Sequence, residues 1–382
     1  MNVRKPPMGW NTWNTFGLEC NDALIRQSAD AMIDLGLKDA GYEYIVIDDG
    51  WSLKRRDPKT DELVPDPDKF PNGMKSVGDY IHSKGLKFGM YSCCGIRTCG
   101  NYPGSFDHEF LDAKTFASYG VDLLKYDNCF HPANANGPQL YHRMGTALSL
   151  CGRDIVFSAC NWGKDDVWSW IRSAGAHMYR STYDLKDNFK NFTTFGMSQY
   201  DGKLQYSAPN CFNDLDMMTI GMYGEGFCGT EGCNDANYEL QFAMWCMASS
   251  PLFIGCDIRK LSEKSMAILT NKELIAIDQD EDARPPFLIT ATGDSTYTTQ
   301  CPTYAKRLSN GDFAIACFNF ADRDTHAYFI FDELGLSASS GYGLQLTDLY
   351  SGEEMDPIRE FASVKVPKGG CRIFRAKPVK ML

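Results

Sequence analysis

Several features that would assign this chain to a broad functional class are missing from its sequence. No apolar run approaches the ~20 residues that a membrane-spanning helix needs, and we find no internal repeat and no low-complexity tail. Positive charge is in deficit, because 38 lysines and arginines face 49 aspartates and glutamates, giving a net charge of −11. An acidic chain disfavours nucleic acid and anionic membranes as partners and favours a neutral or cationic ligand.

Motifs for cofactors are also missing. Neither a Gly-x-Gly-x-x-Gly fingerprint nor a phosphate-binding loop follows the first predicted strand, which weakens a nucleotide-binding interpretation. No paired Cys-x-x-Cys pattern occurs, and the six histidines do not cluster with the cysteines, so a zinc site is not indicated. The N-terminus is basic but lacks the apolar stretch of a signal peptide. We therefore expect a cytoplasmic protein, or a secreted one whose signal has been removed.

Cysteine and aromatic residues are abundant. The 15 cysteines are an odd number, and we expect most of them to be buried thiols. Cys228 and Cys233 flank Gly-Thr-Glu-Gly, as either a small disulfide loop or two unrelated thiols. Aromatic residues make up 13% of the chain, a surplus that suits carbohydrate sites, where rings stack on sugar faces, and suits cores equally.

With 382 residues, the chain exceeds the size at which one hydrophobic core usually stops growing, so we expect two domains. Apolar strands alternate with helical segments about eight times over roughly the first 280 residues. The predicted strands are 8–13, 44–47, 87–91, 121–127, 154–158, 177–180, 211–216 and 251–254. The predicted helices are 21–37, 74–83, 110–119, 139–151, 166–173, 187–197, 237–249 and 261–269. This alternation predicts an α/β fold, a (β/α)8 TIM barrel over residues 1–284, with an open doubly wound sheet as the alternative.

The pattern changes after residue 284. Short alternating segments, separated by turns such as Ser309-Asn-Gly-Asp312, replace the helix–strand rhythm. They predict strands at 296–300, 304–308, 313–320, 327–331, 345–348, 363–366 and 371–375. We therefore expect a C-terminal antiparallel β-sandwich over residues 285–382.

The predicted strand 121–127 carries the most informative residues. Its apolar run ends in Lys125 and Asp127, two positions apart. Because the side-chain period of a strand is two, both side chains share one face where the strand leaves the core. The carboxyl ends of parallel strands carry the chemistry in α/β proteins. A structural ion pair explains this segment alone equally well.

Other predicted strands also end in charged or aromatic residues. They are Asp48, Asp49, Arg180, Asp184, Asp214 and Asp216, joined by Trp13, Trp51, Tyr91 and Trp162. On a barrel, all of them would ring one mouth. Carboxylates accept paired hydrogen bonds from vicinal hydroxyls and aromatic rings cover the apolar face of a sugar, so the ring predicts a neutral sugar ligand. Two of the carboxylates would then serve as the nucleophile and the acid of a retaining glycosidase.

The alternative is a magnesium or calcium site with oxygen ligands from Asp48, Asp49, Asp127 and Asp184. The neighbouring Lys125 and Arg180 oppose it, because fixed cations repel a metal ion.

The sequence resembles the α-galactosidases of glycoside hydrolase family 27, the melibiases, which also hold α-N-acetylgalactosaminidases. The matching segments are MGWNTWNTF, YIVIDDGW, KFGMY, RTCGNYPGSF, GVDLLKYDNC, YRSTYDL, FNDLDM and PLFIGCDIR. The resemblance implies a barrel followed by an antiparallel β-domain, and hydrolysis of terminal α-galactosides in oligosaccharides or glycoconjugates with retention of configuration. It implies no cofactor and no metal. Family members are often dimers, so a homo-oligomer is compatible with it.

Carried over residue by residue, the resemblance implies Asp127 as the nucleophile and Asp184 as the acid/base. It implies that Lys125 hydrogen-bonds the sugar and keeps Asp127 ionised, since a nearby cation lowers the pKa of a carboxyl. The other pocket positions that it implies are Asp48 and Asp49 at the C4 and C6 hydroxyls, Arg180 near the 2-hydroxyl, Trp13 as an indole wall, Tyr91, Asp216 and Met217. Cys99 and Cys129 correspond to a disulfide that lines the family's pocket.

The chain departs from the family pattern at several places, among them Leu215 where a proline is usual and Phe212 where a tryptophan is usual. Gly50 stands where a cysteine is usual, which leaves Cys20 without its partner. In the loop that reads the sugar's 2-substituent, Cys160 and Trp162 match the plant-like pattern and Asn161 replaces the animal-type glutamate.

The substrate follows from the same loop. A bulky Lys164 would crowd an acetamido group, so we expect galactose rather than N-acetylgalactosamine. The alternatives are β-L-arabinopyranose, which the intact Asp48–Asp49 pair disfavours, and a non-catalytic sugar-binding barrel, which the presence of both Asp127 and Asp184 disfavours.

Overall fold

The computed structural model describes residues 1–289 and 300–381, and its N-terminal part is a parallel barrel. The strands are β1 (Met8–Asn11), β2 (Tyr44–Val46), β3 (Lys87–Cys93), β4 (Leu123–Asp127), β5 (Val156–Cys160), β6 (Met178–Arg180), β7 (Phe212–Asp214) and β8 (Leu252–Ile254). Consecutive strands pair in parallel from β1 to β7, and β8 pairs with β1. Met218 closes the ring between β7 and β8, because its N–H donates to the Phe253 carbonyl at 2.7 Å and its carbonyl accepts from the Gly255 N–H at 3.0 Å. The predicted barrel is confirmed, and the open sheet is wrong.

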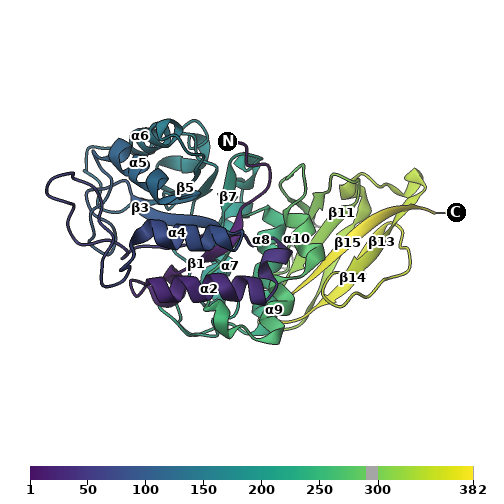
Figure 1. Cartoon of the computed structure of the whole chain (residues 1–382). Coiled ribbons are helices and arrows are strands. Elements are labelled where there is room, and N and C mark those ends of the chain that lie inside the picture. The colour runs from purple at the N-terminus through teal and green to yellow at the C-terminus, as the bar shows by residue number, and fades with distance from the viewer. Residues whose placement is uncertain (290–299, 382) are drawn as a thin grey trace.

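Helices surround the barrel strands (Figure 1). They are α1 (Trp13–Phe16), α2 (Asp22–Asp34), α3 (Leu37–Ala40), α4 (Gly73–Ser83), α5 (Glu109–Tyr119), α6 (Gly137–Leu150), α7 (Phe189–Tyr200), α8 (Asp235–Ala248), α9 (Glu263–Leu269) and α10 (Lys272–Asp278), with 3₁₀ turns η2 (Leu204–Tyr206) and η3 (Ile258–Lys260). Asparagines cap several of them: the side chains of Asn21, Asn136, Asn188 and Asn234 each accept a backbone N–H three residues on. None of the described helices has the length and apolar content to cross a bilayer.

The helix predicted over residues 166–173 is wrong. The chain forms a short 3₁₀ turn there, η1 (Lys164–Ser169), in which Asp165 and Asp166 have φ of 54° and 50°. Trp162 and Gly163, just before it, have φ of 61° and 80°. An α-helix needs consecutive right-handed residues, so these four positive values make the chain turn after β5 instead of starting a helix.

Strand β4 shows how side-chain alternation builds the mouth of the barrel. Leu123 packs inside the barrel with Val46, Met178 and Phe253, whereas Leu124 and Tyr126 pack outside it, in the core shared with the helices. Lys125 and Asp127 have the same parity as Leu123 and therefore face the interior, at the carboxyl end of the strand. Lys125 and Asp127 were predicted to share one face of their strand, and that face is the one directed into the barrel.

The C-terminal part contains a five-stranded sheet in the order β13-β15-β11-β10-β9 and a two-stranded sheet of β12 and β14. The strands are β9 (Phe287–Ile289), β10 (Thr303–Arg307), β11 (Phe313–Phe318), β12 (Thr325–Ile330), β13 (Tyr342–Asp348), β14 (Phe361–Val366) and β15 (Cys371–Lys380), with 3₁₀ turns η4 (Phe331–Leu334) and η5 (Ala338–Ser340). All pairings are antiparallel, and one apolar core, including Ile315, Phe329 and Phe374, unites both sheets. The predicted sandwich is confirmed. Strand β9 was not predicted, and the strand expected at 296–300 lies, except for Gln300, outside the described residues.

The sandwich packs against the helices α8 to α10 (Figure 1). The Tyr350 hydroxyl donates to the Glu239 carbonyl at 2.6 Å, and the buried Lys306 ammonium donates to the Ile277 carbonyl at 3.0 Å. These contacts run through helices α8 and α10 rather than through the strand ends that carry the charged residues.

Candidate active site

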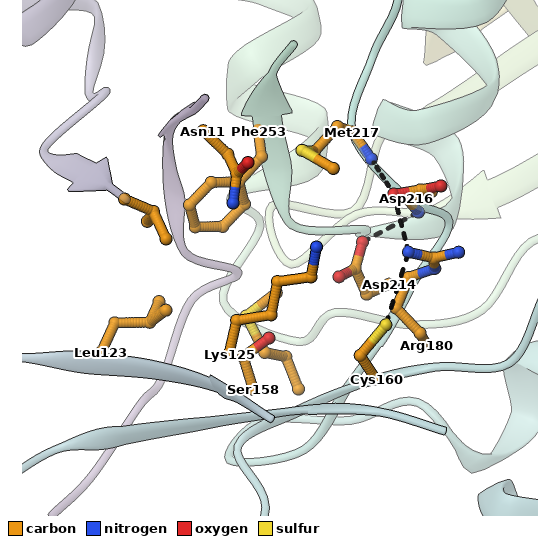
Figure 2. A pocket seen from close by; sticks show the side chains of 12 residues that line it. Asn11, Leu123, Lys125, Ser158, Cys160, Arg180, Asp214, Asp216, Met217 and Phe253 are labelled. Atoms are coloured by element: carbon orange, nitrogen blue, oxygen red, sulfur yellow. Dashed lines mark hydrogen bonds and ion pairs between the residues drawn. The ribbon is translucent and has the colours of Figure 1, made fainter. Parts of the chain in front are cut away.

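A pocket of about 350 Å³ lies at the carboxyl ends of the barrel strands (Figure 2). Apolar side chains from inside the barrel form its base, namely Val46, Leu123, Met178 and Phe253. The other lining residues are Asn11, Lys125, Ser158, Cys160, Arg180, Asp214, Asp216 and Met217. The lining combines apolar side chains with charged and polar ones, so the pocket suits a partly polar molecule.

Asp48 and Lys125 form one side of the site. The Asp48 carboxylate is buried, and its Oδ2 accepts hydrogen bonds from Lys125 Nζ and Asn11 Nδ2, both at 2.8 Å. Burial opposes the charge on Lys125, but Asp48 and other carboxylates outweigh it and raise the pKa of the ammonium. Lys125 is therefore a fixed cation, and its ammonium extends into the pocket (Figure 2).

Asp49 is held by backbone groups. Its Oδ1 accepts from the Gly50 N–H at 2.8 Å and its Oδ2 from the Gly100 N–H at 2.7 Å. Burial raises the pKa of Asp49, and these hydrogen bonds counter only part of that rise. Asp49 thus joins the end of β2 to the loop that carries Cys99.

Asp127 is fixed at the end of β4. Tyr91 Oη donates to its Oδ2 at 2.7 Å and the Asn128 N–H donates to its Oδ1 at 2.9 Å. The Cys99–Cys129 disulfide, with the two Cα atoms 5.4 Å apart, lies against it, because Cys99 Sγ is 3.9 Å from Asp127 Oδ2. The disulfide that the family resemblance implied is present, and it borders the carboxylate.

Arg180 organises the opposite side (Figure 2). Its Nη1 donates to Asp216 Oδ1 at 2.9 Å and its Nη2 to Asp184 Oδ1 at 3.0 Å, while Cys160 Sγ lies 3.6 Å from Nη1. Arg180 is 2% exposed, whereas the Asp184 side chain is 55% exposed. The Met217 N–H donates to Asp216 at 2.7 Å. Asp184 therefore connects a buried cation to the protein surface, and neither Asp184 nor Asp127 is among the residues that line the pocket.

The two aspartates that the family resemblance singles out have pKa values shifted in opposite directions. Burial raises the pKa of Asp127 to about 6, although Lys125 lowers it. Burial also opposes ionisation of Asp184, but Arg180 and Lys125 outweigh it and lower the pKa of Asp184. Lys125 lowers the pKa of Asp127, as expected, but burial outweighs it and the net shift is upward. Because each carboxylate also perturbs the other, the two form one titrating pair whose single proton favours Asp127.

Two predicted tryptophans lie at the edge of this arrangement. Trp13 packs edge-on against Phe227, with ring centroids 5.1 Å apart, and contacts the apolar interior of the barrel. Trp162 is tilted against Tyr183, with ring centroids 6.3 Å apart, and is not among the residues that line the pocket.

The loop after β5 differs from its prediction in detail. The Lys164 ammonium lies 5.3 Å from the centre of the exposed Tyr183 ring, and its side chain is exposed. Lys164 is not among the residues that line the pocket, and its crowding of a sugar's 2-substituent stays a prediction. Cys160 lines the pocket instead, and Asn161 is fully buried, with neither amide atom hydrogen-bonded within the described residues.

Sequence reasoning missed some lining residues. Asn11 follows Gly9 by two positions on β1, so the alternation that placed Lys125 would also have placed Asn11 inside the barrel. Asp214 was seen as a charged strand end but given no role. It is buried, its Oδ1 accepts the Asp216 N–H at 2.9 Å, and burial raises its pKa to about 6.

The four aspartates of the hypothetical magnesium or calcium site do not form a compact ligand set within the described residues. The set that does, with ligand atoms all within 4.8 Å of one another, is Cys99, Asp127 and Cys129. Asp48 and Asp184 are instead engaged by the cations Lys125 and Arg180.

Known proteins resemble this chain along its whole length. The family model described as alpha galactosidase A matches residues 5–280, and that of the alpha galactosidase C-terminal beta sandwich domain matches residues 298–376. An α-galactosidase of Cyamopsis tetragonoloba is 36% identical over 374 residues, which cover 98% of this chain and 86% of that protein.

Solved structures agree. α-Galactosidase I from Mortierella vinacea superposes with a TM-score of 0.88 at 30% identity, covering 98% of this chain and 97% of that one. The α-galactosidase of Saccharomyces cerevisiae with raffinose gives 0.87 at 27% identity, covering 98% of both chains. Since the family models match both domains, the chain belongs to the α-galactosidase family of glycoside hydrolases.

Proposed function

We propose that this protein hydrolyses terminal α-D-galactosides with retention of configuration, and that Asp127 is its nucleophile and Asp184 its acid/base. The observation that carries the proposal is the electrostatic interaction of these two carboxylates: Lys125 lowers the pKa of both, Arg180 forms an ion pair with Asp184, and both cations line the pocket. Retaining glycosidases need two such carboxyl groups flanking the glycosidic bond. Raffinose, bound in the Saccharomyces relative, is itself an α-galactoside.

The chemistry takes two displacements. Asp127 Oδ1 or Oδ2 attacks the anomeric carbon while Asp184 donates a proton to the glycosidic oxygen, and the aglycone leaves as an alcohol. The Asp184 carboxylate then removes a proton from water, which attacks the anomeric carbon and releases Asp127. Two inversions give net retention, and Asp184 ends protonated, as it began.

Proton placement is the first requirement of this scheme. The protein's own groups favour the proton on Asp127, whereas attack needs it on Asp184. The pair shares one proton, so moving that proton from Asp127 to Asp184 leaves the net charge of the pair unchanged. The productive arrangement is therefore a tautomer of the favoured one. Substrate groups that displace the Arg180 contact from Asp184 would favour that tautomer.

Recognition of the sugar falls to the fixed groups around the pocket. Asp48, held by Lys125 and Asn11, retains lone pairs for hydroxyl donors. Arg180 and Cys160 line the side on which the family resemblance puts the 2-hydroxyl. Met217 and Phe253 supply apolar surface for a sugar's C–H face.

The pH dependence of kcat/KM should be bell-shaped. Above about pH 6 the pair loses its last proton, mainly from Asp127, so no acid remains and kcat/KM falls about tenfold per pH unit. At the acid end, the lowered pKa of Asp184 lets the pair keep one negative charge to below the ordinary aspartate value of 3.8. A profile measured on an aryl α-galactoside that stays flat through pH 8 would contradict the two-carboxylate assignment.

Replacing Tyr91 with phenylalanine should lower kcat/KM by about 10- to 100-fold, because a hydrogen bond to a charged group contributes about 1.5–3 kcal/mol. Tyr91 lowers the pKa of Asp127, so its loss should also shift the alkaline limb to higher pH. Phenylalanine keeps the buried ring, and an unchanged thermal unfolding midpoint would exclude general damage. Full activity with an unshifted profile would mean that Tyr91 does not act on Asp127.

The function itself is tested with matched p-nitrophenyl glycosides: α-galactoside, α-N-acetylgalactosaminide and β-L-arabinopyranoside. We expect the α-galactoside to dominate, with α-galactose as the first anomer seen by NMR. Dominant turnover of the acetamido sugar would mean that the wall formed by Cys160 and Arg180 admits a larger 2-substituent. The absence of turnover with all three would favour the sugar-binding alternative.

A further inference from the structure

The disulfide beside Asp127 is unusual among the cysteines of this chain. Cys99–Cys129 is the one disulfide in the described residues, and the other thirteen cysteines, Cys20, Cys228 and Cys233 included, are free. Twelve of those thirteen are buried, whereas Cys99 is exposed beside Asp127. A dissolved reductant can therefore reach the sulfur that lies 3.9 Å from the Asp127 carboxylate.

Reduction would leave three metal-ligating groups together. Cys99 Sγ, Cys129 Sγ and an Asp127 oxygen all lie within 4.8 Å of one another. In a tetrahedral zinc site with Zn–S bonds of ~2.3 Å, two sulfurs lie roughly 3.8 Å apart, a separation that freed cysteine side chains reach by small χ1 changes. The Cα–Cα distance of 5.4 Å leaves both side chains pointing at the same place.

We propose that reduction of the Cys99–Cys129 disulfide creates a binding site for a thiophilic divalent cation such as Zn²⁺, which takes the carboxylate of Asp127 as its third protein ligand and blocks turnover. The loss of turnover rests on the proposed function, but the binding does not. A water molecule would complete the tetrahedron.

The chemistry balances with an added phosphine as reductant. The phosphine and one water molecule convert the disulfide into two thiols, and the phosphine is oxidised to its oxide. Zn²⁺ then replaces the two thiol protons, which are released to solvent. Two thiolates and one carboxylate give the zinc centre a net charge of −1.

Lys125 therefore does not oppose this ion as it opposes Mg²⁺ or Ca²⁺. It already contacts Asp48, and a centre with a net negative charge attracts its ammonium. Thiolate ligands also select zinc over the hard cations that aspartates alone would bind. The proposed site thus differs in both metal and ligands from the four-aspartate alternative.

The test compares oxidised and phosphine-reduced enzyme in the presence of ZnCl2 at neutral pH. We expect equilibrium dialysis to find one more zinc ion per chain on the reduced enzyme, and Co²⁺ to give a thiolate charge-transfer band only after reduction. At zinc concentrations about ten times the Kd, α-galactoside turnover should fall about tenfold and recover with a chelator. Neither zinc nor the chelator should change the α-galactoside turnover of the oxidised enzyme.

Two serine variants control the assignment. Cys99→Ser should lose the extra zinc ion and its inhibition, whereas Cys151→Ser should keep both, since Cys151 is the one free cysteine that is not buried. Equal zinc content in oxidised and reduced wild-type enzyme would overturn the proposal, and this comparison needs no substitution. If no glycoside is turned over, dialysis and the cobalt band still decide the binding.

Discussion

Replacement of Asp127 with asparagine is expected to lower turnover of an aryl α-galactoside by about 10⁴-fold or more, as removal of an enzyme's nucleophile does. Asparagine keeps the shape of the side chain, and its single amide oxygen can still accept one of the two hydrogen bonds that Tyr91 Oη and the Asn128 N–H donate to Asp127. What it lacks is the charge that attacks the anomeric carbon. The fall should therefore appear in kcat, and the variant should still bind galactose.

Asp257 offers a matched control for this variant. It is an aspartate in the segment after β8 and is engaged by Arg259 outside the pocket. Asp257→Asn should retain turnover within a few-fold. A smaller nucleophile variant, Asp127→Gly, should be rescued by azide and yield β-galactosyl azide, because one displacement inverts the configuration. Wild-type turnover in Asp127→Asn would remove Asp127 from the mechanism.

Replacement of Asp184 with asparagine should have a large effect that depends on the leaving group. General acid catalysis contributes about 10²–10⁴-fold, so hydrolysis of raffinose should fall by that factor. A dinitrophenyl galactoside, whose aglycone leaves without a proton, should form the galactosyl-enzyme at nearly the wild-type rate. Arg180 retains Asp216 as a partner, so the variant should keep its fold.

The configuration of the azide product distinguishes the role of Asp184 from that of Asp127. With Asp184→Asn, azide attacks the galactosyl-enzyme, and the product should be α-galactosyl azide, with retained configuration. An equal loss of activity on raffinose and on the dinitrophenyl substrate, with no azide product, would mean that Asp184 holds the site together without donating a proton.

Much of the fold could be predicted because local patterns carry it. The apolar run of β4 ends in Lys125 and Asp127, and period-two alternation alone determines that both face one side. Seven of the eight strand–helix units follow from similar patterns, the helix after β5 being the exception, and the register of β3, β4 and β5 then brings their carboxyl ends together. The proposed nucleophile could be placed in this way from its position on a strand.

The features of the fold and the site that the sequence did not predict depend on contacts between residues far apart in the chain or on burial by the whole barrel. Four of the five residues from Trp162 to Asp166 have positive φ, all except Lys164, and they turn the chain after β5, although the sequence suggested a helix. Lys164 lies over Tyr183, a residue from a different loop. The family resemblance implied that Lys125 keeps Asp127 ionised, but the burial that outweighs this cation depends on the whole barrel.

The proposed double displacement is tested most directly by trapping its intermediate. A 2-fluoro galactosyl donor with a good leaving group slows hydrolysis of the galactosyl-enzyme, so the adduct accumulates. After peptic digestion and mass spectrometry, we expect the sugar on the peptide that contains Asp127, and no labelling of the Asp127→Asn variant. An adduct on the peptide that contains Asp184, or turnover without any covalent adduct, would contradict the assignment of Asp127 as nucleophile.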